Sequence, residues 1–275
     1  MSFKPLTVRT LLTTITSPDY LFGGHYTLDP YQNCSFGCQY CDSAQDETIY
    51  IKINAPEILK QELHEHAKGT IVIGSVHDPY QPAEQTAQLT RRLLPLIDDQ
   101  GFSVHILTKS PLVLRDLDLL SALHTCRVTL SIPSLSENIT GIIEPRVPSA
   151  KERLQIIQEL HTAGISTGLA VMPLLPYFVE PELESIVSTA YHYHVDYLLY
   201  KPLELKGDQY TRYTHMLKRH FPQLVTLYEQ LYHERYLPDQ TYLTPLTQKL
   251  EALCKQYGIP TRLRLNETKK IKRGL

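Results

Sequence analysis

Few features of this sequence point to a secreted or membrane-bound protein. Its five cysteines are odd in number, so a scaffold of disulfides is a poor fit and a reducing compartment is expected. The formal net charge is only −2, which gives no global attraction to nucleic acid or to membranes. The first 20 residues hold one lysine, one arginine and no long apolar run, so we expect neither a signal peptide nor a membrane span there. These absences predict a cytoplasmic protein that does not contact a membrane.

Low-complexity segments and repeats of a short fixed period are absent as well. What is present is enough apolar material for one substantial core, since 42% of the 275 residues are hydrophobic. One large α/β domain and two small domains fit this length equally well. Nineteen prolines and twelve glycines suit a fold with many short connections.

Short β-branched runs alternate with amphipathic stretches along most of the chain. The expected strands are 20–28, 70–76, 102–108, 127–133, 165–173 and 195–202, and the expected helices are 54–67, 82–99, 114–124, 149–164 and 181–194. Strands that alternate with crossover helices form parallel βα units, and six units are too few to close an eight-stranded barrel. We therefore expect an α/β fold, a partial (β/α)6 TIM-like barrel that stays open, with chemistry at the C-terminal ends of its strands.

The helix expected at 149–164 has the clearest end signals. Ser149 is a good N-cap residue, and Glu152 stands three residues later, as in a capping box. Gly164 is suited to end the helix.

Residues 203–275 do not continue the alternation. They predict helices at 208–236, interrupted at Pro222, and at 244–257, followed by a strand at 261–265. We therefore divide the chain into a core of residues 1–202 and a C-terminal helical extension of residues 203–275 that ends in a basic tail. Basic side chains near tyrosines can bind nucleic acid, but a solvated tail explains the same pattern.

Three of the cysteines, Cys34, Cys38 and Cys41, form a C-x3-C-x2-C run. Three thiolates can hold three irons of a cubane [4Fe–4S] cluster and leave the fourth iron open to a small molecule. The run can also supply three of four zinc ligands. The fourth ligand would then have to be Cys126, Cys254 or one of the 12 histidines, none of which is close in sequence.

With the segments around it, this run resembles the spore photoproduct lyase-like branch of the radical S-adenosylmethionine (SAM) superfamily. The matching segments, in order, are DPYQNCSFGCQYC (29–41), HDPYQPAE (77–84), TR (90–91), TKSPLVLRDLDLL (108–120), SIPS (131–134), EPRVPSAKERL (144–154) and VMPLLP (171–176). The resemblance implies a barrel of the radical SAM type, with a [4Fe–4S] cluster on the three cysteines of the loop 29–42 and with SAM as the second cofactor.

The same resemblance assigns cofactor contacts at strand ends. Tyr40 is expected beside the adenine of SAM, or as an aromatic shield over the cluster, and His77 and Asp78 are expected at its methionine end or ribose. Lys109 is a fixed cation that can pair with the SAM carboxylate, and Ser131 is expected to hydrogen-bond the amino group or ribose.

Arg146 is the last of the expected contacts. It follows in the loop after Ser131 and is expected to bind cofactor or substrate, or simply to pair with Glu144.

The chain departs from its apparent relatives in several places. Asp29 and Asn33 stand where Asn and Gly are common, and Asp42 adds negative charge beside the cluster loop. Photoproduct lyases carry a hydrogen-donating cysteine at the position of Ser75. The O–H bond of a serine is too strong to replace a thiol as a hydrogen-atom donor, so repair of DNA photoproducts is disfavoured.

These patterns predict an enzyme in which a reduced cluster cleaves SAM and the resulting 5′-deoxyadenosyl radical abstracts hydrogen from a substrate. By analogy with the family, the substrate is a nucleotide or a nucleic-acid base, and the electron donor is a flavodoxin or ferredoxin. We expect a monomer. The alternative is a non-catalytic zinc- or Fe–S-binding interaction protein on the same fold, against which the presence of Lys109, Ser131 and the 77–82 segment argues.

Overall fold

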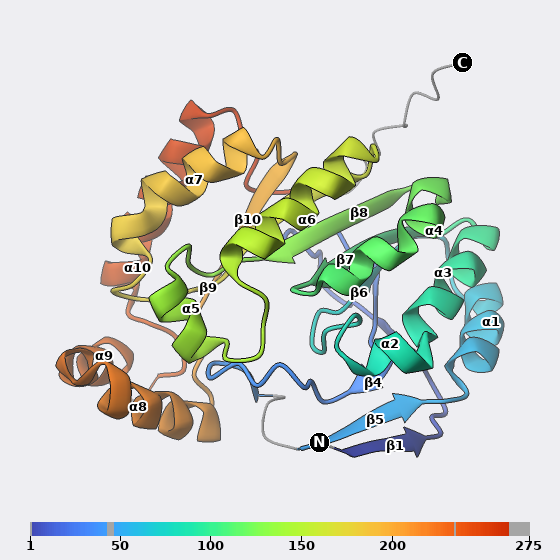
Figure 1. The fold of residues 1–275 in the computed structure, drawn as a ribbon, viewed down its shortest axis with the longest axis horizontal. Helices are drawn as coiled ribbons and strands as arrows, with labels where there is room; N and C mark the ends of the chain where they lie inside the picture. The colour runs from blue at the N-terminus through green and yellow to red at the C-terminus, as the bar shows by residue number, and fades with distance from the viewer. Residues whose placement is uncertain (1, 43–46, 234, 264–275) are drawn as a thin grey trace.

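The structure is a computed structural model that describes residues 2–42, 47–233 and 235–263. Its main sheet has seven strands in the order β10-β9-β8-β7-β6-β3-β2 (Figure 1). Their bounds are β2 Leu12–Thr14, β3 Tyr26–Leu28, β6 Thr70–Ile73, β7 Ser103–Thr108, β8 Cys126–Ser131, β9 Ser166–Leu174 and β10 Tyr197–Pro202. Neighbours from β3 to β10 are parallel, and β2 is antiparallel to β3 at the edge.

The six parallel strands and the helices between them confirm the expected open (β/α)6 barrel. The helices are α1 Ala55–Glu65, α2 Ala83–Ala87, α3 Leu89–Asp99, α4 Leu117–Ala122, α5 Glu137–Ile143, α6 Ala150–Thr162 and α7 Leu183–His192. Short 3₁₀-helices precede α4 and α7, at Pro111–Asp116 and Glu180–Glu182. In the described part of the chain β2 and β10 each end the sheet, so the barrel does not close.

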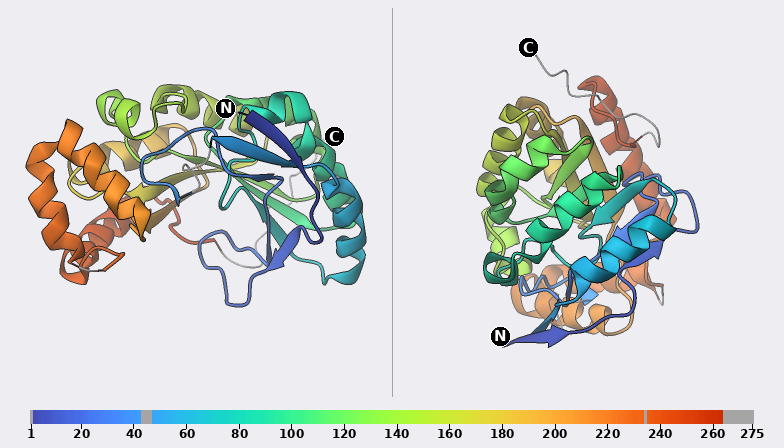
Figure 2. Two further views of the ribbon diagram at one scale, coloured as in Figure 1. Left: turned by 90° about the horizontal axis from the view of Figure 1, so that it is seen from below. Right: turned by 90° about the vertical axis from the view of Figure 1, so that its right-hand side faces the viewer.

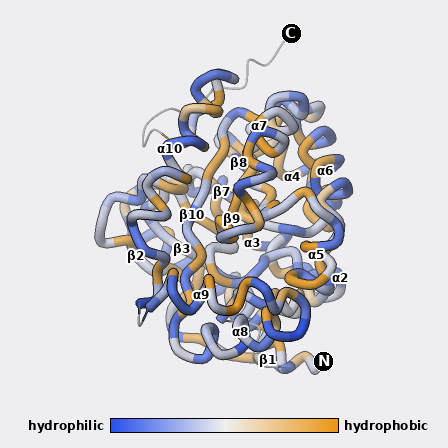
Figure 3. Tube along the Cα trace, turned by 90° about the vertical axis from the view of Figure 1, so that its left-hand side faces the viewer, coloured by the Kyte–Doolittle hydropathy of each residue, from blue (hydrophilic) through white to orange (hydrophobic). Residues whose placement is uncertain are grey.

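The parallel strands form because their apolar runs are buried on both faces. All four residues of β6 are buried, and β9 buries seven of its nine. In Figure 1 the helices α1, α3, α4, α6 and α7 follow the outer side of the curved sheet. Figure 3 shows hydrophobic residues along the strands and mixed hydropathy along the outer helices, as expected for helices that bury one face.

Several boundaries differ from the sequence prediction for local reasons. The strand expected at 20–28 begins only at Tyr26, because the Asp19 carboxylate accepts backbone N–H groups of Leu21, Phe22 and Gly24 and holds a turn. The strand expected at 70–76 ends at Ile73. Gly74 has φ +90°, and a Cβ there would lie 2.4 Å from a backbone oxygen of β7, so the chain turns away.

The helices also differ in detail. The helix expected at 82–99 is two helices, because Gln88 has φ +48° and ends α2. The Glu84 carboxylate then accepts the N–H groups of Thr90 and Arg91 at the start of α3. The expected capping box is present at Ser149 and Glu152, whereas α5 was not predicted.

A second sheet, also not predicted, has the order β1-β5-β4, with β1 at Ser2–Leu6, β4 at Tyr31–Gln32 and β5 at Thr48–Lys52. It lies beside the barrel, as both views in Figure 2 show. Strand β4 follows β3 almost directly, so this small sheet carries the start of the cysteine-bearing loop.

After β10 the chain forms α8 Asp208–His220, a short segment Pro222–Leu224, α9 Val225–Tyr232 and α10 Gln240–Gln256. Helix α10 begins earlier than expected because Asp239 caps its N-terminus. The strand expected at 261–265 is wrong for the described residues 261–263, which are irregular. Its last two residues and the basic tail beyond Leu263 lie outside the described residues.

The C-terminal helices contribute to two cores. Residues of α10, among them Leu246, Leu250 and Cys254, belong to the main barrel core. Residues of α8 and α9 form a second core with Ile143 of α5 and with Leu175. Within the described ranges, no helix is long and apolar enough to cross a membrane.

Candidate active site

The C-terminal ends of the parallel strands meet at one edge of the sheet, and the cysteine loop lies there between β4 and β5. Asn33 and Gly37 have φ of 68° and 65°, which give the loop its tight turns. Cys38 is buried, and Cys34 and Cys41 are half-buried. All three thiols therefore lie on one short loop beside the strand ends.

Gln81 holds this loop from the segment after β6. Its Oε1 accepts the backbone N–H of Ser35 at 3.0 Å, and its Nε2 donates to the backbone oxygen of Asn33 at 2.9 Å. The side chain is fully buried. The two bonds flank Cys34, so Gln81 fixes the backbone on both sides of the first cysteine.

A network of charged side chains supports the start of the same loop, and its two carboxylates, Glu84 and Asp116, are buried. The hydroxyl of Tyr31, at the start of the loop, donates to Glu84. Glu84 pairs with Arg115 at 2.6 Å, and Asp116 pairs with both Arg115 and Arg91, at 2.7 and 2.9 Å. The segments 77–84, 90–91 and 108–120, noted above for the family resemblance, supply most of this network.

The thiols have the chemistry that an iron–sulfur cluster needs. Burial raises the pKa of Cys34 to about 11 and that of Cys38 further, so both thiols keep their protons until a metal displaces them. Among the described residues, no three His, Cys, Asp or Glu side chains converge on a point where one metal ion could bind. The cysteines of a cubane each bind a different iron, whereas the ligands of a zinc ion must meet at one point. Three thiols on one short loop are a donor set that fits an iron–sulfur cluster.

Tyr40 belongs to a buried network that joins the loop to β8. Its hydroxyl donates to Glu144, whose other oxygen lies 2.7 Å from Arg153 Nη2 in a fully buried ion pair that lacks hydrogen-bond alignment. Arg153 Nη1 donates to the backbone oxygen of Ser131 at 2.6 Å. Arg153 thus links the end of β8 to Glu144, and Glu144 links it to Tyr40 of the cluster loop.

Lys109 is the cation at the centre of this arrangement. Its Nζ lies 6.0 Å from the centre of the Tyr40 ring. Burial by itself lowers the pKa of Lys109, but Cys38, Glu144 and Asp78 together raise it above its ordinary value. The ammonium group is therefore charged and faces the ring of Tyr40.

Both carboxylate oxygens of Asp78 accept hydrogen bonds from the protein. Its Oδ1 accepts from Thr108 Oγ1 at 2.7 Å and from the Tyr80 N–H, and its Oδ2 accepts the Lys109 N–H at 2.8 Å. Burial raises the pKa of Asp78. In the structure, Asp78 fixes the backbone of Lys109. Its role at the cofactor stays a prediction.

His77 has a nitrogen available for a ligand. Its backbone N–H donates to Asp29 Oδ1 at 3.1 Å, while its Nδ1 is buried and has no partner among the described residues. Burial lowers the pKa of His77, which favours the neutral ring. A neutral imidazole can accept or donate one hydrogen bond at such a nitrogen.

Ser131 lies at the end of β8, and Arg146 lies beside Gly37 of the cluster loop. Ser131 Oγ donates to the backbone oxygen of Met172 at 3.0 Å, so only its lone pairs are free for a cofactor. Arg146 lies against the cluster loop, where a Cβ at Gly37 would be 2.1 Å from its Nη2. Glu144 pairs with Arg153 and not with Arg146, so the simple pairing considered for Arg146 is wrong.

Helix α8 covers the other side of the loop. Gln209 Nε2 donates to the Tyr40 backbone oxygen at 3.1 Å, and Arg212 Nη2 donates to the Cys41 backbone oxygen at 2.8 Å. Neither residue was predicted, because a contact between residues 169 positions apart leaves no local pattern. Gln81, Glu84 and Arg153 were also missed as individual residues, although each lies in a segment noted for its family resemblance.

Comparison with known proteins agrees with this geometry. Residues 28–190 match the model of the Radical SAM superfamily. The uncharacterized protein MJ0683 of Methanocaldococcus jannaschii is 30% identical over 220 residues, which cover 75% of this chain and 80% of that protein. The uncharacterized protein Rv2578c of Mycobacterium tuberculosis is 26% identical over 255 residues, 85% of this chain and 75% of its own.

Solved structures show the same fold. Spore photoproduct lyase complexed with dinucleoside spore photoproduct superposes with a TM-score of 0.73 at 15% identity, covering 93% of this chain and 79% of that one. Streptococcus suis SuiB bound to S-adenosylmethionine gives 0.54 at 15% identity, over 74% of this chain and 47% of that one. The family match covers more than half of the chain and includes all three cysteines. The chain therefore belongs to the radical SAM superfamily, whose cofactors are a [4Fe–4S] cluster and SAM.

Proposed function

We propose that this radical SAM protein is an enzyme that abstracts hydrogen from a nucleotide or a nucleic-acid base. The cluster and SAM, when bound, supply a 5′-deoxyadenosyl radical by reductive cleavage. The observation that carries the proposal is the arrangement of Cys34, Cys38 and Cys41 on a loop held by Gln81, with the Lys109 ammonium 6.0 Å from the centre of the Tyr40 ring on the same loop.

The chain's own residues have positioning roles in this proposal. The three cysteines hold the cluster. Lys109, fixed through its backbone by Asp78, provides the cation for the carboxylate of SAM. The unpartnered Nδ1 of His77 is available for a polar group of the cofactor.

Three more residues complete the proposed cofactor site. Tyr40 presents its ring while its hydroxyl is held by Glu144. Ser131 presents lone pairs at the end of β8. Arg146 places positive charge against the loop, where it can favour the reduced cluster or contact the substrate.

The substrate class is supported by likeness of fold alone. One structural neighbour is a spore photoproduct lyase with a dinucleoside ligand, and the chain covers 79% of it. Ser75 lies in the turn after β6, where a hydroxyl cannot act as the thiol donor of that reaction. We therefore propose a nucleic-acid or nucleotide substrate, but not photoproduct repair.

The remaining predictions stand as part of the proposal. An electron donor is required by this enzyme class, and we propose a flavodoxin or ferredoxin. We retain the monomer, the cytoplasmic location and the division at residue 202 as predictions. The rival function is a non-catalytic Zn- or Fe–S-binding interaction protein.

One experiment separates the two functions. After anaerobic reconstitution, the wild type should hold four irons and four sulfides and, with dithionite, convert SAM to 5′-deoxyadenosine. Ala variants of Cys34, Cys38 and Cys41 should each lose both properties, and Cys126→Ala, which removes a thiol from β8, should keep them. Zinc in place of iron, or a loaded cluster that never cleaves SAM, would favour the interaction protein.

A further inference from the structure

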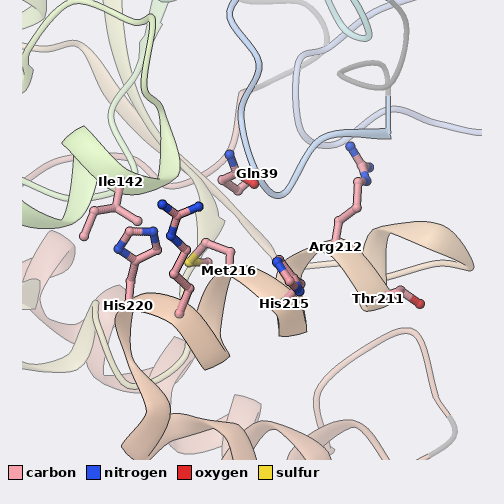
Figure 4. Close-up of a pocket in the computed structure, with 8 residues that line it drawn as sticks. Gln39, Ile142, Thr211, Arg212, His215, Met216 and His220 are labelled. Carbon is pink, nitrogen blue, oxygen red and sulfur yellow. The ribbon is translucent and has the colours of Figure 1, made fainter.

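A pocket lies between the cluster loop and the C-terminal helices. Its volume is about 370 Å³. Figure 4 shows Gln39 of the loop and Ile142 of α5 on one side and side chains of α8 on the other. Gln39 stands between Cys38 and Cys41 in the sequence, so the pocket borders the loop that carries the cluster ligands.

The wall formed by α8 is basic. Arg212, His215 and Arg219 line it at three- and four-residue spacing, and His220 lies four residues after Met216, so all are on one face of the helix. No acidic side chain is among the lining residues. The whole chain has a formal charge of −2, so this positive charge is a local concentration.

Among the described residues, no acidic side chain pairs with Arg212 or Arg219. Arg212 donates from Nη2 to the Cys41 backbone oxygen, while its Nε is buried without a partner among the described residues. Arg219 is exposed and forms no ion pair with any described residue. A guanidinium group that has no acidic partner is suited to bind the oxygens of a phosphate.

The other lining groups fit a nucleotide as well. Thr211 and Gln39 offer a hydroxyl and an amide, and Ile142 and Met216 offer apolar surface. Pockets of this size with a few convergent polar groups typically take small ligands or segments of a polymer.

We propose that this pocket binds phosphate groups of a single-stranded nucleic-acid substrate and so holds a nucleotide beside the cluster loop. The proposal rests on the substrate class proposed above and adds the site that recognises its backbone. Arg219 and His215 contact phosphate oxygens. Arg212 contacts the phosphate and the cluster loop together, which couples substrate binding to the loop.

An acidic electron-donor protein is the competing occupant of this basic face. A protein interface needs about 800 Å² on each partner, whereas the basic groups here line a pocket of about 370 Å³. The shape therefore favours a phosphate over a protein surface.

The test measures binding of short fluorescein-labelled oligothymidylate and oligouridylate to the reconstituted protein by anisotropy at several salt concentrations. Arg219→Gln and His215→Gln remove pocket groups. Lys218→Gln is the matched control, because Lys218 is exposed on the same helix but does not line the pocket. Iron content and thermal unfolding establish that every variant is folded.

Arg219→Gln should weaken binding about three- to tenfold and reduce the salt slope by about 0.7, the value for one phosphate contact on a single strand. Lys218→Gln should stay within about twofold of the wild type. Preference between the two oligonucleotides would identify DNA or RNA as the source of the phosphate.

Two results would overturn the proposal. One is equal binding by Arg219→Gln, His215→Gln and Lys218→Gln. The other result has two parts. The pocket variants bind oligonucleotide as the wild type does, and they lose turnover when a flavodoxin supplies electrons but not when dithionite does. This result would assign the basic face to the electron donor. A wild type that binds oligonucleotide in the pocket but never cleaves SAM would instead refute the proposed radical chemistry and leave the pocket site standing.

Discussion

At the scale of single residues, the site depends on a few charges that the protein holds in place without neutralising them. Lys109 is half-buried, and although burial by itself lowers its pKa, Cys38, Glu144 and Asp78 together raise that pKa above its ordinary value. Its backbone is held by Asp78 and its ammonium is directed toward the Tyr40 ring. A cation held in this way has already lost most of its conformational freedom, so binding an anion there costs little further entropy.

Replacing Lys109 by Met should therefore weaken SAM binding by about 1.5–3 kcal/mol, the range for a hydrogen bond to a charged group. Anaerobic calorimetry on the reconstituted protein measures this directly, with iron content as the check that the cluster remains. Lys151→Met, on the exposed start of α6, is the control. An unchanged dissociation constant for the Lys109 variant would remove this residue from the cofactor site.

The side chain at position 75 should decide whether a thymine photoproduct can be repaired. The wild type, with Ser75, should give slow or aberrant product from a dinucleotide photoproduct while still forming 5′-deoxyadenosine. Ser75→Cys supplies the missing hydrogen-atom donor and should increase the yield of thymine, as chromatography of the products will show. Efficient repair by the wild type would contradict the predicted loss of this activity.

His105 should make the fold sensitive to mild acid. Burial lowers its pKa to about 4, and its ring is held by Phe22 oxygen and by Thr129 at 2.9 and 2.7 Å. In the unfolded chain the ring takes up a proton near pH 6.5, so the unfolded state binds more protons between pH 6.5 and 4. Stability is therefore present above this window and is lost as the pH falls through it, by about 3 kcal/mol.

Chemical denaturation at a series of pH values measures this loss. His105→Gln should be less stable than the wild type at pH 7 but should lose less between pH 6.5 and 4. His64→Gln, which changes an exposed histidine on α1, should follow the wild type. Identical pH profiles for all three proteins would exclude His105 as the cause.

At the scale of elements, the loop of residues 29–42 has little regular structure and depends on its neighbours. Gln81 supports it from the segment after β6, Glu144 from the end of α5, and Gln209 and Arg212 from α8. A loop without its own hydrogen-bonded ladder keeps one conformation only when surrounding elements satisfy its backbone groups.

Gln81→Ala should loosen the loop, because it removes the acceptor of the buried Ser35 N–H and the donor to the Asn33 backbone oxygen. A buried N–H group that loses its acceptor costs about 1–3 kcal/mol. Iron should then be lost faster to a chelator, and the rate of bleaching of the visible cluster absorbance measures this. Gln85→Ala, an exposed glutamine four residues later, is the matched control. Equal rates for the two variants would show that Gln81 does not hold the loop.

At the scale of the whole molecule, the C-terminal helices are part of the folded core. Helix α10 adds Leu246, Leu250 and Cys254 to the barrel core, and α8 and α9 build a second core against Ile143. A unit of residues 1–202 would expose these contact surfaces. The proposed division at residue 202 therefore separates two sequence patterns. We do not expect residues 1–202 to fold without the C-terminal helices.

A chain that ends after residue 202 should fail to unfold cooperatively. Full burial of one aliphatic side chain contributes about 1.5–3 kcal/mol, so loss of several such contacts matches the whole stability of a typical domain. A chain that ends at Leu263 keeps α8, α9 and α10 and serves as the comparison. Calorimetry compares the two, and a sharp transition for residues 1–202 would show that the core is autonomous.

The sequence by itself determined the features that are local or periodic. The spacing of Cys34, Cys38 and Cys41 is fixed along the chain, and so is the capping box at Ser149 and Glu152. The alternation of apolar strands with amphipathic helices predicted six parallel strands, because burial on both faces requires continuous apolar runs. These signals need no knowledge of which distant segments meet.

Only the tertiary structure decided which side chains surround the cysteines. Gln81 bonds to Asn33 from 48 positions away, and Tyr40 meets Glu144 across 104 positions and Gln209 across 169. The small sheet of β1, β5 and β4 and the pocket on α8 arise in the same way. Such contacts form because packed elements bring unlike polar groups together, and a glutamine or arginine has the same local pattern whether it faces solvent or a buried backbone. Sequence spacing could therefore predict the cluster ligands, while their supports and the basic pocket beside them required the fold.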